Sequence, residues 1–257
     1  MSEQTTDDPS TWGTPEGRHM IDLLWDPPTP AARGPKQKLT LERVVDTAMS
    51  IAAKEGVDAL SMRKVAAALG VGAMSLYTYV PGREELFELM IDRAWGDRSR
   101  PDPSLPWREQ VEFHADQAWS MYQSHPWLVW ANLWRMPLGP NVLDVQEDLY
   151  RSFDLTGLPP HTVARVTGLV ESHVFGAARS AIVDTRVSAS TGVSADEYWD
   201  SRSGFWGTYY SQERFPTMTK LWEAGAFDVA MGTEGDMRLG LGVLLDGIEL
   251  LIDAPSG

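Results

Sequence analysis

The residues best suited to chemistry in this sequence are cationic and hydroxyl side chains gathered in one stretch near the N-terminus. Between Arg33 and Arg83 there are eight Lys and Arg residues but only four acidic ones, so this stretch has a charge of +4, whereas the remainder of the chain has −18. Guanidinium, ammonium and hydroxyl groups hydrogen-bond to phosphate oxygens and to base edges. A cationic stretch in an otherwise anionic chain is therefore typical of a nucleic-acid contact confined to one small domain.

The spacing of apolar residues places this stretch on a set of short helices. From Leu39 apolar side chains recur at helical intervals until Gly56, and Ser61 precedes a second run of helix formers. Gly70 supplies a permissive backbone for a sharp turn, and a third short segment, GAMSLYTYV, ends at Pro81. A helix, a short helix, a glycine turn and another short helix make up the helix-turn-helix arrangement.

The third helix of such a unit lies in the major groove of DNA, while the preceding helix crosses the phosphate backbone. Arg63 is the best candidate for a bidentate guanine contact, and hydroxyl and small apolar side chains of the third helix suit bases and thymine methyl groups. The tyrosines suit phosphate contacts, although each has the alternative of packing against the first helix. The predicted DNA-binding set is Ser61, Met62, Arg63, Lys64, Ala73, Met74, Ser75, Tyr77, Thr78, Tyr79 and Arg83.

Four short motifs follow one another between Leu60 and Asp92. They are a hydroxyl-x-Arg opening at 61–63, Ala-x-x-Leu-Gly-Val at 67–71, Leu-Tyr-x-Tyr-Val at 76–80 and Arg-Glu-Glu-Leu at 83–86. In this combination the run resembles the DNA-binding domain of the tetracycline-repressor (TetR) family of bacterial regulators. Gly72 departs from the family pattern, in which a serine-like N-cap is usual, and the early recognition helix lacks a lysine. The resemblance implies a homodimeric regulator, most often a repressor, with a C-terminal helical domain for effector binding and dimerisation.

The rest of the chain also has helical spacing, and no strand-type alternation is evident, so the predicted fold class is all-α. We expect a mostly disordered extension at 1–38, whose basic end is either a DNA-contacting arm or a linker. A three-helix helix-turn-helix DNA-binding domain at 39–96 and a larger ligand-binding and dimerisation domain at 97–257 follow. Helices of the larger domain are expected at about 107–124, 126–135, 140–155, 160–186, 195–223 in pieces, and 234–252.

Tryptophan is abundant in the C-terminal part, where indoles gather around 119–134 and again around 199–222. Such side chains either fill a helical core or line a cavity for a planar, hydrophobic or cationic molecule. Polar residues beside them would orient that molecule, and His114 and His125 are further candidates. The predicted ligand-binding set is Trp119, Tyr122, Trp127, Trp130, Trp134, Glu171, His173 and Trp206.

Small residues mark two long helices as candidates for a dimer interface. Glycines at 240, 242 and 247 lie on the last helix, and Gly168 and Gly176 lie on the helix that starts near 160. Two such helices can pack with their twofold mates, so the sequence favours a homodimer; the alternative is that the small residues serve only crossings within one chain.

Several function classes are excluded. The chain has 257 residues, a net charge of −14 and no cysteine, so disulfides, Cys-ligated metals and thiol catalysis are ruled out. No pair of Glu-x-x-His motifs, His-Glu-x-x-His, P-loop or nucleophile elbow is present, so no catalytic residue, metal site or cofactor is predicted.

Without a signal peptide or a long apolar run, we expect a cytoplasmic protein with no membrane partner. Its predicted partners are double-stranded operator DNA, a small hydrophobic or aromatic effector and a second copy of the chain; the alternative is a ligand-binding bundle or enzyme whose N-terminal unit is structural.

Overall fold

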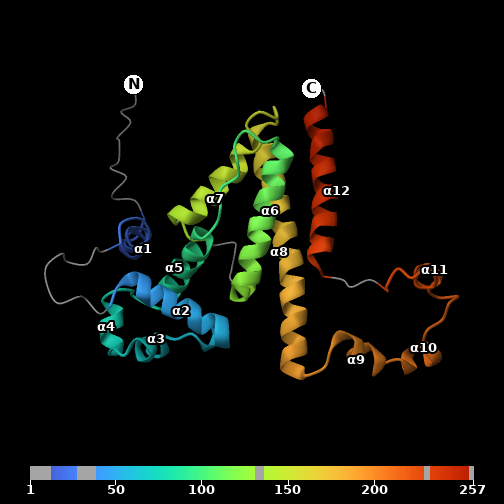
Figure 1. Cartoon of the computed structure of the whole chain (residues 1–257), viewed down its shortest axis with the longest axis horizontal. Coiled ribbons are helices and arrows are strands. Elements are labelled where there is room, and N and C mark those ends of the chain that lie inside the picture. Colours follow the sequence, from blue (N-terminus) through green and yellow to red (C-terminus); the bar gives the residue numbers. More distant parts are fainter. Residues whose placement is uncertain (1–12, 28–38, 131–135, 229–231, 255–257) are drawn as a thin grey trace. The chain divides into compact units, whose positions relative to one another are not determined.

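The computed structural model describes residues 13–27, 39–130, 136–228 and 232–254, and all regular structure in these ranges is helical (Figure 1). The predicted all-α fold class is confirmed. The described residues form two compact units: one contains the chain up to Arg100 together with 130–148, and the other contains 101–129 and everything from Leu149 onward. None of the described helices is both long enough and apolar enough to cross a membrane.

The first unit begins its helices at capping residues that the sequence supplies. The Thr40 hydroxyl accepts a hydrogen bond from the Arg43 amide, and the Ser61 hydroxyl accepts one from the Lys64 amide. Gly70 ends the helix that Ser61 begins, and its backbone has φ +68°, in the left-handed region. The helices are α1 (Pro15–Trp25), α2 (Leu41–Glu55), the 3-10 turn η2 (Val57–Ala59), α3 (Met62–Leu69), α4 (Ala73–Tyr77), α5 (Arg83–Gly96) and the first part of α7 (Pro140–Arg151).

The core of this unit is built from one face of each of α2 to α5. Contributing side chains are aliphatic and almost fully buried, so the short helices are held by packing against one another rather than by their own stability. Its most buried members are Val44, Val65, Leu76, Val80, Leu86 and Met90.

The prediction of a mostly disordered N-terminal extension is wrong for residues 15–25. Thr14 accepts a hydrogen bond from the Gly17 amide and Pro15 occupies the first helical position, which is a strong start signal for a helix. α1 buries Met20, Leu23 and Leu24 and packs on α5. The basic end of the extension, at 31–38, lies outside the described residues.

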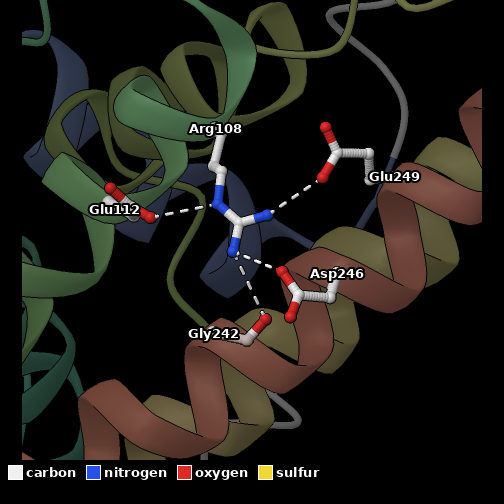
Figure 2. A network of polar contacts seen from close by, with 5 residues as sticks. All are labelled: Arg108, Glu112, Gly242, Asp246 and Glu249. Carbon is white, nitrogen blue, oxygen red and sulfur yellow. Dashed lines mark hydrogen bonds and ion pairs between the residues drawn. The ribbon is translucent and has the colours of Figure 1, made fainter.

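The second unit is a set of longer helices. Arg108 of α6 ties that helix to α12: its guanidinium donates to Asp246 at 2.6 Å, to Glu249 at 3.3 Å and to the carbonyl of Gly242 at 3.5 Å (Figure 2). The helices are α6 (Trp107–Ser124), the 3-10 turn η3 (Pro126–Trp130), the end of α7, α8 (Pro160–Thr191), α9 (Ala195–Asp200), α10 (Gly204–Thr208), α11 (Pro216–Glu223) and α12 (Glu234–Asp253).

Some helix ends differ from the sequence-based ranges. The segment expected at 126–135 is a 3-10 turn as far as Trp130, and 131–135 lie outside the described residues. α7 ends at Arg151 rather than 155, and α8 continues to Thr191 rather than 186. α8 is longer because nothing in its sequence interrupts the helix until Gly192, which adopts φ +67°.

Replacement of Gly70 by alanine should destabilise the protein by about 1–2 kcal/mol, because an L-residue is strained in the left-handed region. Urea unfolding measures the effect. Gly72→Ala is the matched control: its φ of −70° suits any residue, and its new Cβ would meet only the Ser75 hydroxyl at 4.0 Å. Equal effects of the two substitutions would contradict the assigned turn geometry.

Candidate nucleic-acid interface

The N-terminus of α3 presents one exposed guanidinium beside an ion-paired lysine. Arg63 is exposed and, among the described residues, has no ion-pair partner. Lys64, by contrast, forms an ion pair with Glu55 at the end of α2. Ser61 is exposed and uses its hydroxyl as the N-cap of α3. Arg63 is therefore the cation at this helix start that is open to an external anion.

The short helix α4 turns one side chain inward and the others outward. Leu76 is fully buried, whereas Met74 is 78% exposed and Tyr77 is 46% exposed. Ser75 and Thr78 are also exposed, and the Thr78 hydroxyl donates to the Ser75 carbonyl at 2.7 Å. Tyr77 thus keeps nearly half of its surface open to solvent.

Ala73 and Tyr79 flank this exposed surface and are half-buried. Both therefore keep part of their surface open at the edge of α4. The arrangement is a protruding apolar and hydroxyl surface on a helix anchored by one leucine, which matches the size and chemistry of a major groove.

Two of the predicted DNA-binding residues have other roles. Met62 is only 6% exposed, so its side chain belongs to the core. The Arg83 guanidinium donates to the carbonyls of Leu60 and Val57, each at 3.0 Å. Because these bonds close the loop between α2 and α3, Arg83 is primarily a structural clamp and not a free phosphate ligand.

Sequence analysis missed Asp92, a carboxylate of α5 that is 5% exposed. It accepts hydrogen bonds from the Asn141 side chain at 2.8 Å and from the Val142 amide at 3.1 Å, at the start of α7. The available signal was a lone acid within the apolar run LMIDRAW, since a buried charge requires partners.

In the second unit, α6 and α8 enclose part of the predicted ligand set. Trp119, Tyr122 and Trp127 are 8%, 5% and 3% exposed, respectively. The Tyr122 ring meets Phe175 of α8 edge-on, with centroids 5.6 Å apart. Aromatic side chains from α6 and α8 therefore meet directly in the interior of this unit.

Glu171 of α8 lies in the same interior, close enough to Tyr122 to act on it electrostatically. Burial raises the pKa of the Glu171 carboxyl to about 7. Burial, together with the nearby Glu171, also raises the pKa of Tyr122. An acid that is partly protonated at neutral pH can, in that form, donate a hydrogen bond as well as accept one.

The structure does not bring the other predicted ligand residues to this place. Trp130 belongs to the first unit and is 41% exposed, and Trp134 lies outside the described residues. His173 joins α8 to α12, because its Nε2 donates to the Met237 carbonyl at 2.8 Å. Its ring also packs closely on Gly240 of α12: a Cβ added to that glycine would lie 2.3 Å from the His173 Cε1 atom. The prediction that His173 orients a ligand is therefore corrected to a helix-crossing role.

Trp206 belongs to a second aromatic cluster, formed by α10, α11 and the segments beside them. Its ring centroid is 4.8 Å from that of Trp222 and 5.2 Å from that of Tyr210. Trp222 is 56% exposed and Tyr209 is 75% exposed, so this cluster presents aromatic surface outward. The two tryptophan-rich stretches of the sequence are thus two different clusters.

Comparisons with known proteins agree with this geometry. Residues 44–90 match the model of the bacterial regulatory proteins of the tetR family, and residues 100–252 match the tetracyclin repressor-like C-terminal domain. The HTH-type transcriptional repressor DrrR1 of Streptomyces coeruleorubidus is 36% identical over 250 residues, which cover 96% of this chain and 91% of that protein.

Solved structures of ActR, a TetR family protein of Streptomyces coelicolor, are also similar. The structure of ActR in complex with actinorhodin has 28% sequence identity to this chain and a TM-score of 0.70. The similar region covers 84% of this chain and 99% of the ActR chain. The structure of ActR in complex with (S)-DNPA also has 28% identity, with a TM-score of 0.67, and the similar region covers 81% of this chain and 96% of the ActR chain. With both domains matched and a full-length relative above 30% identity, the chain belongs to the TetR family of helix-turn-helix transcriptional regulators.

Proposed function

We propose that this protein is a repressor that binds a pseudo-palindromic operator as a homodimer and releases it when a small aromatic molecule enters the second unit. The observation that carries the proposal is the exposed surface of α4, held outward by the burial of Leu76. The relative named as a repressor and the aromatic molecules bound in ActR support the direction of regulation and the class of effector.

Contacts to DNA follow from the side chains that remain open. Arg63 at the start of α3 offers a planar fork of donors for guanine or phosphate, and Met74 offers apolar contact to thymine methyl groups. Ser75, Tyr77 and Thr78 add hydroxyl groups for bases and phosphates. In a dimer, the two copies of α4 must lie about 34–36 Å apart, or a multiple of that, to occupy successive major grooves.

An aromatic effector is proposed to enter between α6 and α8, beside Tyr122 and Glu171. Aromatic side chains provide stacking surface there, and the carboxyl of Glu171 provides a hydrogen-bond donor for a carbonyl or phenolate oxygen of the ligand. To release DNA, the effector must bind one arrangement of the dimer more tightly than the other, since equal binding shifts no equilibrium.

The dimer is proposed to form through α12 and α8. Leu239, Val243 and Leu250 of α12 are 71%, 67% and 73% exposed, and their spacing places them on one side of the helix. Leu169 of α8 is 54% exposed. The glycines at 168, 176, 242 and 247 have nothing within 4 Å of a Cβ position, which leaves room for another backbone.

Arg63→Ala should weaken binding to a DNA fragment from upstream of the gene by about 10- to 100-fold, because one bidentate contact contributes about 1–3 kcal/mol. Fluorescence anisotropy at fixed salt measures the affinity, and the melting temperature should not change. Arg165→Ala, which removes an exposed arginine of α8, is the control. Unchanged affinity of the Arg63 variant would contradict the proposed interface.

In the same assay, actinorhodin is the first probe for effector-induced release by the wild type.

Glu171→Gln should stabilise the protein at pH 8 but not at pH 4.5. The folded pKa of about 7 lies above the ordinary 4.5, so wild-type stability is fully present below 4.5 and falls as pH rises to about 7. The whole difference amounts to at most about 3 kcal/mol. Urea unfolding at the two pH values measures it, with Asp184→Asn as an exposed control on α8. An unchanged difference between the Glu171 variant and wild type across this range would contradict the burial of this carboxyl.

Val243→Asp combined with Leu250→Asp should convert the dimer to a monomer, because two carboxylates on each copy would face an apolar interface. Analytical ultracentrifugation measures the mass, and operator affinity should fall since one half-site binds weakly alone. Leu155→Asp, at a residue that is 101% exposed, is the matched control. A dimer that persists in the double variant would show that α12 is not the interface.

A further inference from the structure

We propose that Asp92 couples α7 to the DNA-binding helices and that the N-terminal helix α1 braces this joint. The inference rests on the proposed function, since it assigns the residues by which events in the second unit reach the first. All contacts that carry it lie within the first compact unit.

The joint is made by a carboxylate of one helix capping the start of another. The first amides of a helix lack partners within it and favour negative charge. Asp92 of α5 supplies that charge to α7: its Oδ1 accepts from the Val142 amide at 3.1 Å and its Oδ2 from the Asn141 side chain at 2.8 Å. Since Asp92 is 5% exposed, these two hydrogen bonds are shielded from water, which strengthens each of them.

The backbone beside this cap is shaped for close approach. A Cβ on Gly139, immediately before α7, would lie 2.1 Å from Asp92 Oδ1 and 2.3 Å from its carboxyl carbon. A Cβ on Gly96, at the end of α5, would lie 3.2 Å from the side chain of Asn141. Any side chain at 139 must therefore open the joint.

A second attachment holds α7 at its other end within this unit. Asp148 is 2% exposed. It accepts two hydrogen bonds from the Arg100 guanidinium, at 2.9 and 2.8 Å, and forms an ion pair with Arg98 at 2.9 Å. Burial alone would raise the pKa of Asp148, but the hydrogen bonds from the two guanidinium groups outweigh it and lower the pKa. Residues 140–148 are therefore attached at one end to α5 and at the other to the segment that follows α5.

The brace comes from a helix outside the matched DNA-binding segment of 44–90. α1 packs on α5, and the Trp25 indole donates to the carbonyl of Leu138 at 2.8 Å. Leu138 immediately precedes Gly139, so α1 contacts both sides of the joint: α5 by packing, and the start of α7 through this hydrogen bond.

The helix α7 continues from the first unit into the second: residues up to Asp148 belong to one and those from Leu149 to the other. A helix transmits displacement along its axis because its hydrogen bonds keep it stiff. A shift of α7 caused by an effector is thus delivered to α5 through Asp92, and binding of DNA is delivered in the reverse direction, as reciprocity of coupling requires.

The test is hydrogen–deuterium exchange of peptides covering 137–148, with and without a DNA fragment from upstream of the gene, together with anisotropy for affinity. DNA should slow exchange in these peptides of the wild type. In Asp92→Asn and Gly139→Ala, DNA affinity should stay within threefold while the DNA-dependent slowing falls at least fivefold. Trp25→Phe, which replaces the indole by a smaller aromatic ring without an N–H, should reduce the slowing about twofold. Glu147→Gln, the same acid-to-amide change at an exposed position of α7, should behave as wild type.

Retention of the full slowing in both joint variants would overturn the coupling role. So would a parallel loss of DNA affinity, slowing and melting temperature, since that pattern describes a purely structural residue. If Asp92→Asn does not fold, Trp25→Phe decides, because Trp25 is 54% exposed and an aromatic ring remains at that position. A wild type that binds no DNA overturns the proposed function, and with it the coupling, and is recognised by anisotropy before any variant is compared.

Discussion

The structure of the DNA-reading unit depends on the burial of Leu76. A helix as short as α4, with five residues, has no stability of its own, so its position is set by the one side chain it buries. Val80 follows one turn later and is likewise fully buried. With these two fixed in the core of α2, α3 and α5, the intervening side chains are turned outward. The same packing that folds the unit therefore creates its recognition surface.

Electrostatics act on a larger scale than any single contact. The cationic stretch from Arg33 to Arg83 is attracted to DNA, whereas the remainder of the chain, with a charge of −18, is repelled by it. This opposition favours an orientation in which only the first unit approaches the duplex. Within the stretch, however, the cations near α3 are not equivalent: Lys64 is paired with Glu55 and Arg83 is bound to backbone carbonyls, whereas Arg63 at the start of α3 is exposed.

The second unit separates roles that look alike in the sequence. Glu171 of α8 acts electrostatically on Tyr122 of α6, whereas His173, only two residues further along α8, is hydrogen-bonded to α12. Trp206 gathers with its own neighbours in an outward-facing cluster. The abundance of tryptophan in this unit therefore does not correspond to a single aromatic cluster.

The sequence by itself determined the all-α fold, the helix-turn-helix and the family, because helical periodicity, capping residues and a glycine turn are local signals. It also indicated Arg63, Ser75 and Thr78, since residues on the outside of a patterned helix can be read from spacing. It did not reveal that Thr14 and Pro15 begin a helix, although that signal was present. Only the tertiary structure decided the joint of Asp92 with Gly139 and the separation of the aromatic clusters, because each depends on which residues distant in sequence are brought together by packing.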